Sequence, residues 1–126
     1  MNYRSVSLSH AYAAIIGGLV IAIYPQIILS LLELNLTDGL ILVSRVFGAF
    51  LFGLGFSIYS TRDAQVFPFP LVAANALVDL VAAGVFLQAT LSGTVGWAGY
   101  IFAAMFTMNL LTWLIILPQR HQMQSA

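Results

Sequence analysis

Four long apolar stretches dominate this chain of 126 residues and limit what it can fold into. About 20 apolar residues, each adding roughly 1.5 Å along a helix, cross the hydrocarbon core of a bilayer. The stretches cover residues 11–32, 39–60, 69–91 and 94–117. They are too long for strands and do not alternate between apolar and polar residues. The sequence predicts an all-α integral membrane protein, a single four-helix transmembrane bundle over residues 1–126.

The scarcity of charge supports the membrane assignment. Charged residues make up 6% of the chain and hydrophobic residues 61%, whereas soluble domains carry roughly 25% charged residues. The net charge is zero and lysine is absent, so the clustered basic residues that bind nucleic acid are missing. Cysteine is also absent, which excludes disulfides, thiolate catalysis and cysteine metal sites. The expected partner of most of the surface is the lipid bilayer.

Prolines and capping residues mark several helix ends. Pro25 lies inside the first stretch and should kink that helix near Tyr24. The alternative is a shorter first span followed by an interfacial segment over residues 26–34. Thr37 can cap the second helix, and Pro68 suits the beginning of the third.

The arginines indicate the orientation. Four spans place the N-terminus, the second loop and the C-terminus on one side, where Arg4, Arg62 and Arg120 lie. The first loop carries Glu33 and Asp38, and the third loop carries no charge. By the positive-inside rule both termini are cytoplasmic, and we expect a prokaryotic inner (plasma) membrane.

Small residues predict where the helices touch. Lipid provides no hydrophobic drive for helix association, so close approach through glycine and alanine must supply the contact. The second span offers Gly48, Ala49 and Gly53, of which the last two form a small-xxx-small pair. The fourth span offers Gly99 and Ala103. We expect these five residues to form packing surfaces within one bundle; the alternative for this common motif is a self-dimer.

Polar residues within the spans are the candidate functional group. Arg45 lies about 9 Å below the outer end of the second span, and Asp79 lies near the midplane of the third. Asn75 shares a helix face with Asp79, and Asn109 of the fourth span falls at a similar depth. Whether Arg45 pairs with Asp79 stays open, because the two side chains lean towards opposite ends. The cluster is either internal glue or a polar pocket for a proton, an ion or a small ligand.

The remaining polar and aromatic residues give no sign of catalysis. His10 and His121 are expected at the cytoplasmic ends, outside the bundle core, and Trp113 at the inner membrane interface. No span is expected to hold a histidine for haem or chlorophyll. No metal-ligand spacing and no nucleophile with an adjacent base occurs. We expect neither an enzyme nor a bound metal.

Two local patterns, together with the span layout, resemble the DoxX-like family of small four-helix membrane proteins, especially its uncharacterised short members. One pattern is Ser-Arg-Val-Phe-Gly-Ala at 44–49, followed by Leu-Gly at 54–55. The other is Asn-Ala-Leu-Val-Asp at 75–79. Members of that family are often accessory subunits of larger membrane assemblies or have no assigned activity. The resemblance implies a fold-defining role for Arg45 inside the bundle.

These features favour a non-catalytic accessory or assembly subunit that packs laterally in a larger membrane complex, or a homo-oligomer. Phenylalanines 47, 50, 52 and 56 surround the second span, more than one four-helix core can bury. They could contact protein, lipid, quinone or pigment, although no cofactor is required. The alternative is a small oligomeric transporter or channel that uses the intramembrane polar cluster.

Overall fold

The described part of the chain is built from four long helices and one short helix. A computed structural model describes residues 2–64 and 68–117, and within those residues it contains no strand. All four long helices are long and apolar enough to cross a membrane, which confirms the prediction of an all-α bundle. The elements are α1 (Tyr3–Ile23), α2 (Gln26–Leu31), α3 (Asp38–Ser60), α4 (Phe69–Leu91) and α5 (Ala98–Ile116).

The first span begins and ends earlier than the sequence predicted. It covers Tyr3–Ile23 instead of residues 11–32, and the side chain of Asn2 caps it by accepting a backbone hydrogen bond from its first turn. Pro25 disfavours helical backbone at the preceding residue, and Tyr24 accordingly leaves the helix at φ −138° and ψ 66°. The chain then continues as the separate helix α2, as in the alternative of a shorter span.

The last span begins later than predicted. Its helix α5 begins at Ala98 instead of residue 94, because the intervening residues form the turn that follows α4. Gly93 adopts a φ of 72° in this turn, a backbone conformation that glycine accepts at no steric cost.

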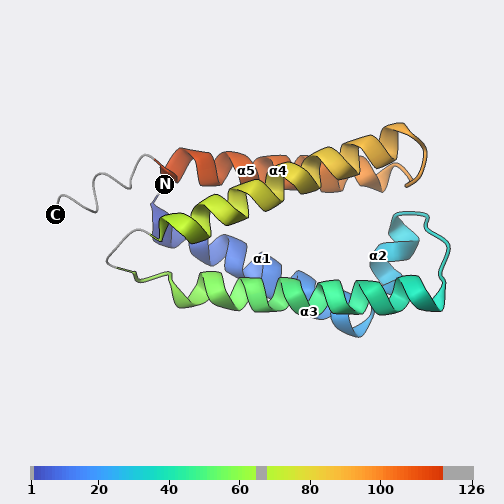
Figure 1. The fold of residues 1–126 in the computed structure, drawn as a ribbon, viewed down its shortest axis with the longest axis horizontal. Coiled ribbons are helices and arrows are strands. Elements are labelled where there is room, and N and C mark those ends of the chain that lie inside the picture. The colour runs from blue at the N-terminus through green and yellow to red at the C-terminus, as the bar shows by residue number, and fades with distance from the viewer. Residues whose placement is uncertain (1, 65–67, 118–126) are drawn as a thin grey trace.

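The long helices form two antiparallel pairs that lie side by side (Figure 1). α1 packs against α3, and α4 packs against α5, with far fewer contacts between the pairs. The start of α1 and the end of α5 lie at one end of the molecule, which we call the terminal end. α2 and the turn between α4 and α5 lie at the opposite, distal end.

Glycines bring α1 and α3 into backbone contact. A Cβ atom at Gly18 would lie 2.8 Å from the carbonyl oxygen of Gly48 and would collide with the backbone of Phe52. One at Gly55 would lie 2.8 Å from the backbone nitrogen of Ile15. Such distances leave no room for a side chain, so the two helices approach as closely as their backbones allow.

The predicted Ala49–Gly53 pair does not contribute to this contact. Gly53 is exposed and has no atom within 4 Å of the position of a Cβ, and Ala49 is exposed as well. A helix advances about 100° per residue, or 3.6 residues per turn, so the face that carries Gly48 and Gly55 points away from Gly53. The small residues of α3 thus lie on two faces of the helix. The face with Gly48 and Gly55 packs on α1, and the face with Gly53 does not.

α4 and α5 associate through small and aromatic residues. Gly99 and Ala103 are buried, and a Cβ atom at Gly99 would collide with the side chain of Thr90. Deeper along the pair, the ring of Phe86 stacks on Phe102 at 5.2 Å and on Phe106 at 5.7 Å between centroids.

The two pairs share one hydrophobic core, which lies at the terminal end. It contains residues from all four long helices, and its largest fully buried side chains are Trp113, Ile58 and Ile116. Polar contacts close this end: the hydroxyls of Tyr3 and Thr61 lie 2.6 Å apart, and Asp63 pairs with both neighbouring arginines, Arg4 and Arg62.

At the distal end the pairs meet through backbone and turn contacts. The amide of Gly96 donates a hydrogen bond of 2.9 Å to the carbonyl of Leu32. The Glu33 carboxylate occupies the space beside Gly96 that a side chain there would need. Because the pairs are joined mainly at their two ends, the middle of the bundle is left open.

The glycine contact predicts different outcomes for two alanine substitutions on α3. Gly48→Ala should lower the free energy of unfolding by about 1–3 kcal/mol, because its methyl group meets the backbone of α1. Gly53→Ala should leave it unchanged or raise it by up to about 1 kcal/mol, because alanine favours a helix and the site is open. Unfolding in mild detergent measures both, and equal effects would contradict the glycine contact.

Candidate functional site

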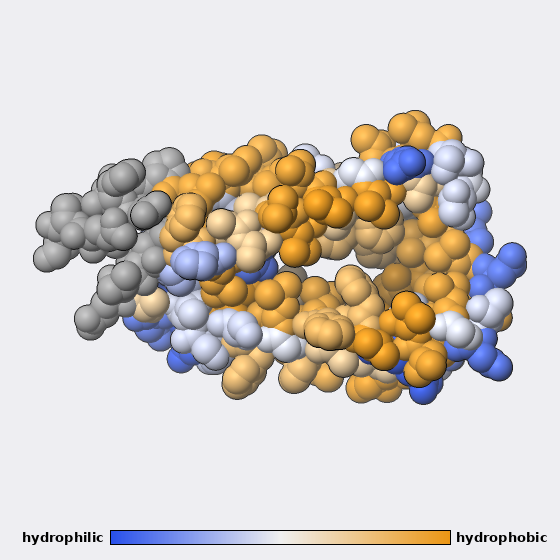
Figure 2. Space-filling view, viewed as in Figure 1, coloured by the Kyte–Doolittle hydropathy of each residue, from blue (hydrophilic) through white to orange (hydrophobic). Residues whose placement is uncertain are grey.

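A cavity of about 630 Å³ occupies the middle of the bundle, between the two helix pairs. Figure 2 shows it as a hollow in the long side of the molecule, bordered by hydrophobic surface. The helices run along the long axis, so this opening faces the hydrocarbon and not the ends of the bundle. Sites for small ligands commonly enclose roughly 300–1,000 Å³, and this cavity lies within that range.

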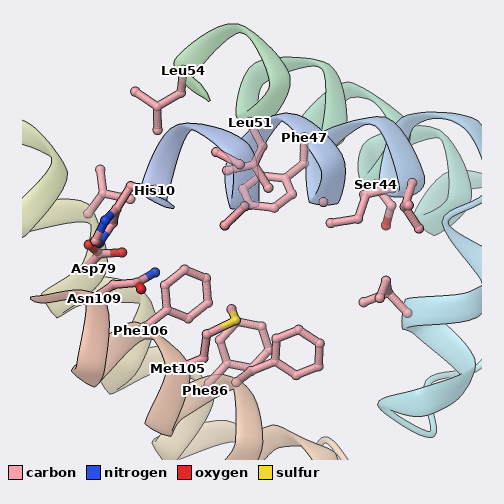
Figure 3. Close-up of a pocket in the computed structure, with 18 of the residues that line it drawn as sticks. His10, Ser44, Phe47, Leu51, Leu54, Asp79, Phe86, Met105, Phe106 and Asn109 are labelled. Carbon is pink, nitrogen blue, oxygen red and sulfur yellow. The ribbon is translucent and has the colours of Figure 1, made fainter. Parts of the chain in front are cut away.

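Regular stripes on the four long helices form the walls. α3 contributes Ser44, Phe47, Leu51, Leu54 and Ile58, which recur every three or four residues and so share one face. Figure 3 shows Phe47 and Leu51 across the cavity from Phe86, Met105 and Phe106. The distal end is closed by apolar residues of α2 and its flanks, Pro25, Ile28, Leu29 and Leu32.

Polar side chains gather where the cavity meets the terminal core. Asn75, Asp79, Asn109 and His10 all line the cavity. Figure 3 shows His10, Asp79 and Asn109 together at one end. Asp79 is only 7% exposed. The side chains of Trp113 and Asn109 lie beside its carboxyl group. The cavity is therefore amphipathic, with a long apolar body and a short polar end.

His10 connects the polar end to the backbones of α1 and α5. Its Nδ1 lies 2.9 Å from the carbonyl oxygen of Val6, and since a carbonyl only accepts, Nδ1 carries the proton. Nε2, unprotonated in the neutral ring, lies 3.1 Å from the hydroxyl of Thr112, whose single proton is shared with the carbonyl of Asn109 at 2.7 Å. The imidazole is therefore held by hydrogen bonds on both ring nitrogens.

Two groups at the polar end keep free hydrogen-bonding capacity. The indole nitrogen of Trp113 is buried and lies beside the Asp79 carboxyl group, but makes no hydrogen bond of normal geometry with the described residues. Its ring packs at 4.4 Å from the ring of His10. The amide of Asn75 donates to the carbonyl of Leu71 at 2.8 Å, which leaves its carbonyl oxygen as an acceptor. Buried polar groups normally have partners, so a polar ligand group or water would be accommodated here.

Arg45 does not join the polar cluster. Asn75, Asp79 and Asn109 come together as the sequence suggested, but Arg45 is exposed and does not line the cavity. Its neighbour Ser44 faces the cavity, and one residue further along a helix points about 100° away. The predicted cluster of four polar residues is therefore a cluster of three, without a cationic member from α3.

Two residues of the site were assigned elsewhere from the sequence. His10 was expected outside the bundle core, but α1 begins at Tyr3, which places His10 two turns inside the helix. Trp113 was expected towards the inner membrane interface; the structure places it near the end of α5, where it is 1% exposed within the core. His10 shares one face of α1 with Ala14, Gly17 and Ile21, at helical spacing. This spacing was the signal that could have identified His10 as a residue inside the bundle. His121 lies outside the described residues.

Comparisons with known protein families, with characterised proteins and with solved structures give no match to this chain. Within the described residues, no three histidine, aspartate or glutamate side chains are grouped to hold a metal ion. The chemistry of the cavity itself therefore carries the functional inference.

The free indole nitrogen predicts how Trp113 contributes to stability. Trp113→Phe should lower the free energy of unfolding by less than about 1.5 kcal/mol, because it keeps most of the packing and breaks no hydrogen bond of normal geometry, only a weak contact with Asp79. Trp113→Ala should lower it by about 3–5 kcal/mol by creating a hole in the core. Unfolding in detergent measures both, with the exposed Trp97→Phe as the control. An equal loss for the first two variants would contradict a purely packing role.

Proposed function

We propose that this protein binds a lipid-soluble amphipathic molecule within the bilayer. The observation that carries the proposal is a cavity of about 630 Å³ that has apolar walls, a polar end and an opening towards the hydrocarbon. A molecule dissolved in the membrane can reach such a cavity without crossing water. Its apolar part would lie against Phe47 and Phe106, and its polar group beside Asp79 and Asn109.

Ordinary membrane lipid explains the apolar walls but not the polar end. An acyl chain gains nothing from a buried carboxyl group, and polar groups without partners in a low-dielectric interior lower stability. Asp79 lies near the middle of α4, about 15 Å from its first residue, too deep for a lipid headgroup at the surface. A ligand with its own polar group at that depth satisfies both regions.

The orientation that accompanies this proposal has both termini in the cytoplasm. Arg4 and Arg62 belong to the terminal end, whereas Glu33 belongs to the distal end. The positive-inside rule supports a cytoplasmic terminal end, in a prokaryotic inner membrane. Arg120 lies outside the described residues.

A matched pair of methionines on α5 tests ligand binding. Met105 lines the cavity, whereas Met108 is 61% exposed and does not line it. Met105→Trp should fill part of the cavity and remove a co-purifying lipid-soluble compound, or lower its amount at least tenfold. Met108→Trp should retain it. Solvent extraction of protein purified in mild detergent, followed by mass spectrometry, measures the bound compounds.

The proposal is contradicted if the wild type, Met105→Trp and Met108→Trp all carry the same compounds in the proportions found in the surrounding membrane. That result would mean that the cavity holds bulk lipid. A compound enriched on the wild type and on Met108→Trp alone supports a specific site.

A second candidate role is that of an accessory subunit in a larger membrane complex, as the resemblance to the DoxX-like family suggested. One observation favours it: Arg45 is exposed on a membrane-spanning helix and makes no ion pair with the described residues. A guanidinium at this depth needs a carboxylate of another protein, or must extend to the membrane surface. The same helix exposes Phe50 and Phe56.

Purification in a mild detergent tests the accessory role. The wild-type protein should elute with a partner, and Arg45→Gln should lower the amount of that partner at least several-fold, because an intramembrane ion pair is lost. Arg4→Gln, which changes an exposed arginine at the terminal end, should retain it. Recovery of the wild type as a monomer without a partner would contradict this role.

A further inference from the structure

The cavity contains one acidic side chain and no arginine or lysine. Asp79 is the acid, and His10 is the other titratable residue among its lining. The ion pairs among the described residues join Asp63 to Arg4 and Arg62 at the terminal end, so no described cation pairs with Asp79. The exposed Arg45 points away from the cavity. An ionised Asp79 would therefore have no compensating arginine or lysine among these residues.

The groups that face Asp79 stabilise it only as dipoles. α4 contributes Asn75, and α5 contributes Asn109 and Trp113. α3 contributes no titratable group to the cavity. α1 contributes His10 as a neutral imidazole, which donates from Nδ1 to Val6 and has Nε2 against the hydroxyl of Thr112. A carboxylate inside a low-dielectric medium requires an opposite charge or a proton, and these neighbours supply neither.

Aromatic rings extend from the polar end along the cavity. Phe106 lies one turn from Asn109 on α5 and stacks with Phe86, which stacks in turn on Phe102. Phe47 lies opposite them. The faces of aromatic rings attract cations, so charge and aromatic character favour the same kind of ligand.

We propose that the cavity binds a lipid-soluble organic cation, such as a protonated or quaternary amine, whose positive charge replaces a proton on Asp79. This inference rests on the proposed function and specifies its ligand. The carboxylic acid releases its proton to water as the cation enters, so the charge of the cavity stays constant. A zwitterionic or anionic lipid is disfavoured, because its phosphate would lie beside the carboxylate.

Three aromatic probes that differ in charge test the proposal. Tetraphenylphosphonium is a cation, tetraphenylborate is an anion of matching shape, and tetraphenylmethane is neutral, of the same shape and without a polar group. Titration calorimetry of the wild-type protein in a neutral detergent should show at least tenfold tighter binding of the cation than of the other two. The heat should depend on the buffer, since one proton is released for each cation bound. The affinity should rise with pH, because the proton and the cation compete for Asp79.

Two isosteric substitutions identify the carboxylate responsible. Asp79→Asn should weaken binding of the cation at least tenfold, remove the proton release and leave binding of the neutral probe unchanged. Asp38→Asn makes the same chemical change at an exposed acid outside the cavity and should have no effect. If Asp79→Asn fails to fold, the proton release and charge preference of the wild type decide the question alone.

The possible failures are distinguishable. Equal affinity of the wild type for all three probes, or cation binding without proton release, overturns the cation inference and leaves the proposed function in place. If no probe binds, the cation inference fails, and the co-purification experiment with Met105→Trp and Met108→Trp decides separately whether the cavity holds another amphipathic ligand.

Discussion

The backbone contact between α1 and α3 at Gly18 and Gly48 is the constraint on which the rest of the structure depends. Helices in lipid gain no free energy from hiding apolar surface, so they associate where close packing gives the most van der Waals contact. α1 and α3 use their glycine faces on each other, whereas Gly99 of α5 lies against the side chain of Thr90 on α4. Each helix thus has one close partner within its own pair.

This pairing leaves larger side chains to face the space between the pairs. α3 turns Phe47 and Leu51 towards that space, and α5 turns Met105 and Phe106. Bulky residues on both sides separate the pairs, which meet at the shared core of the terminal end and at the turn contacts of the distal end. The cavity is a consequence of two well-packed pairs joined at their ends, and α2 closes it on the distal side.

The polar end of the cavity lies beside the best-packed part of the molecule. Trp113 belongs to the core and also lines the cavity, and His10 is held between Val6 and Thr112. A group fixed on rigid helices presents its polar atoms in one geometry, which favours recognition of a ligand. The apolar walls are more exposed and more adaptable, since methionine and leucine can change rotamer at low energetic cost. In small-molecule sites, a few polar groups typically orient the ligand, and apolar walls accommodate its shape.

The sequence by itself determined the number of spans, the helical class and the clustering of Asn75, Asp79 and Asn109, but not where the first and last helices begin. Span length and polarity are fixed by the thickness of the bilayer, and residues three or four apart share a face in any helix. The tertiary structure alone decided which face of α3 meets α1, and therefore that Arg45 is exposed while Gly48 is buried. It also brought His10 and Trp113, 103 positions apart in the chain, into contact at Asp79. Helix rotation and pairing depend on contacts between distant segments, which no local pattern encodes.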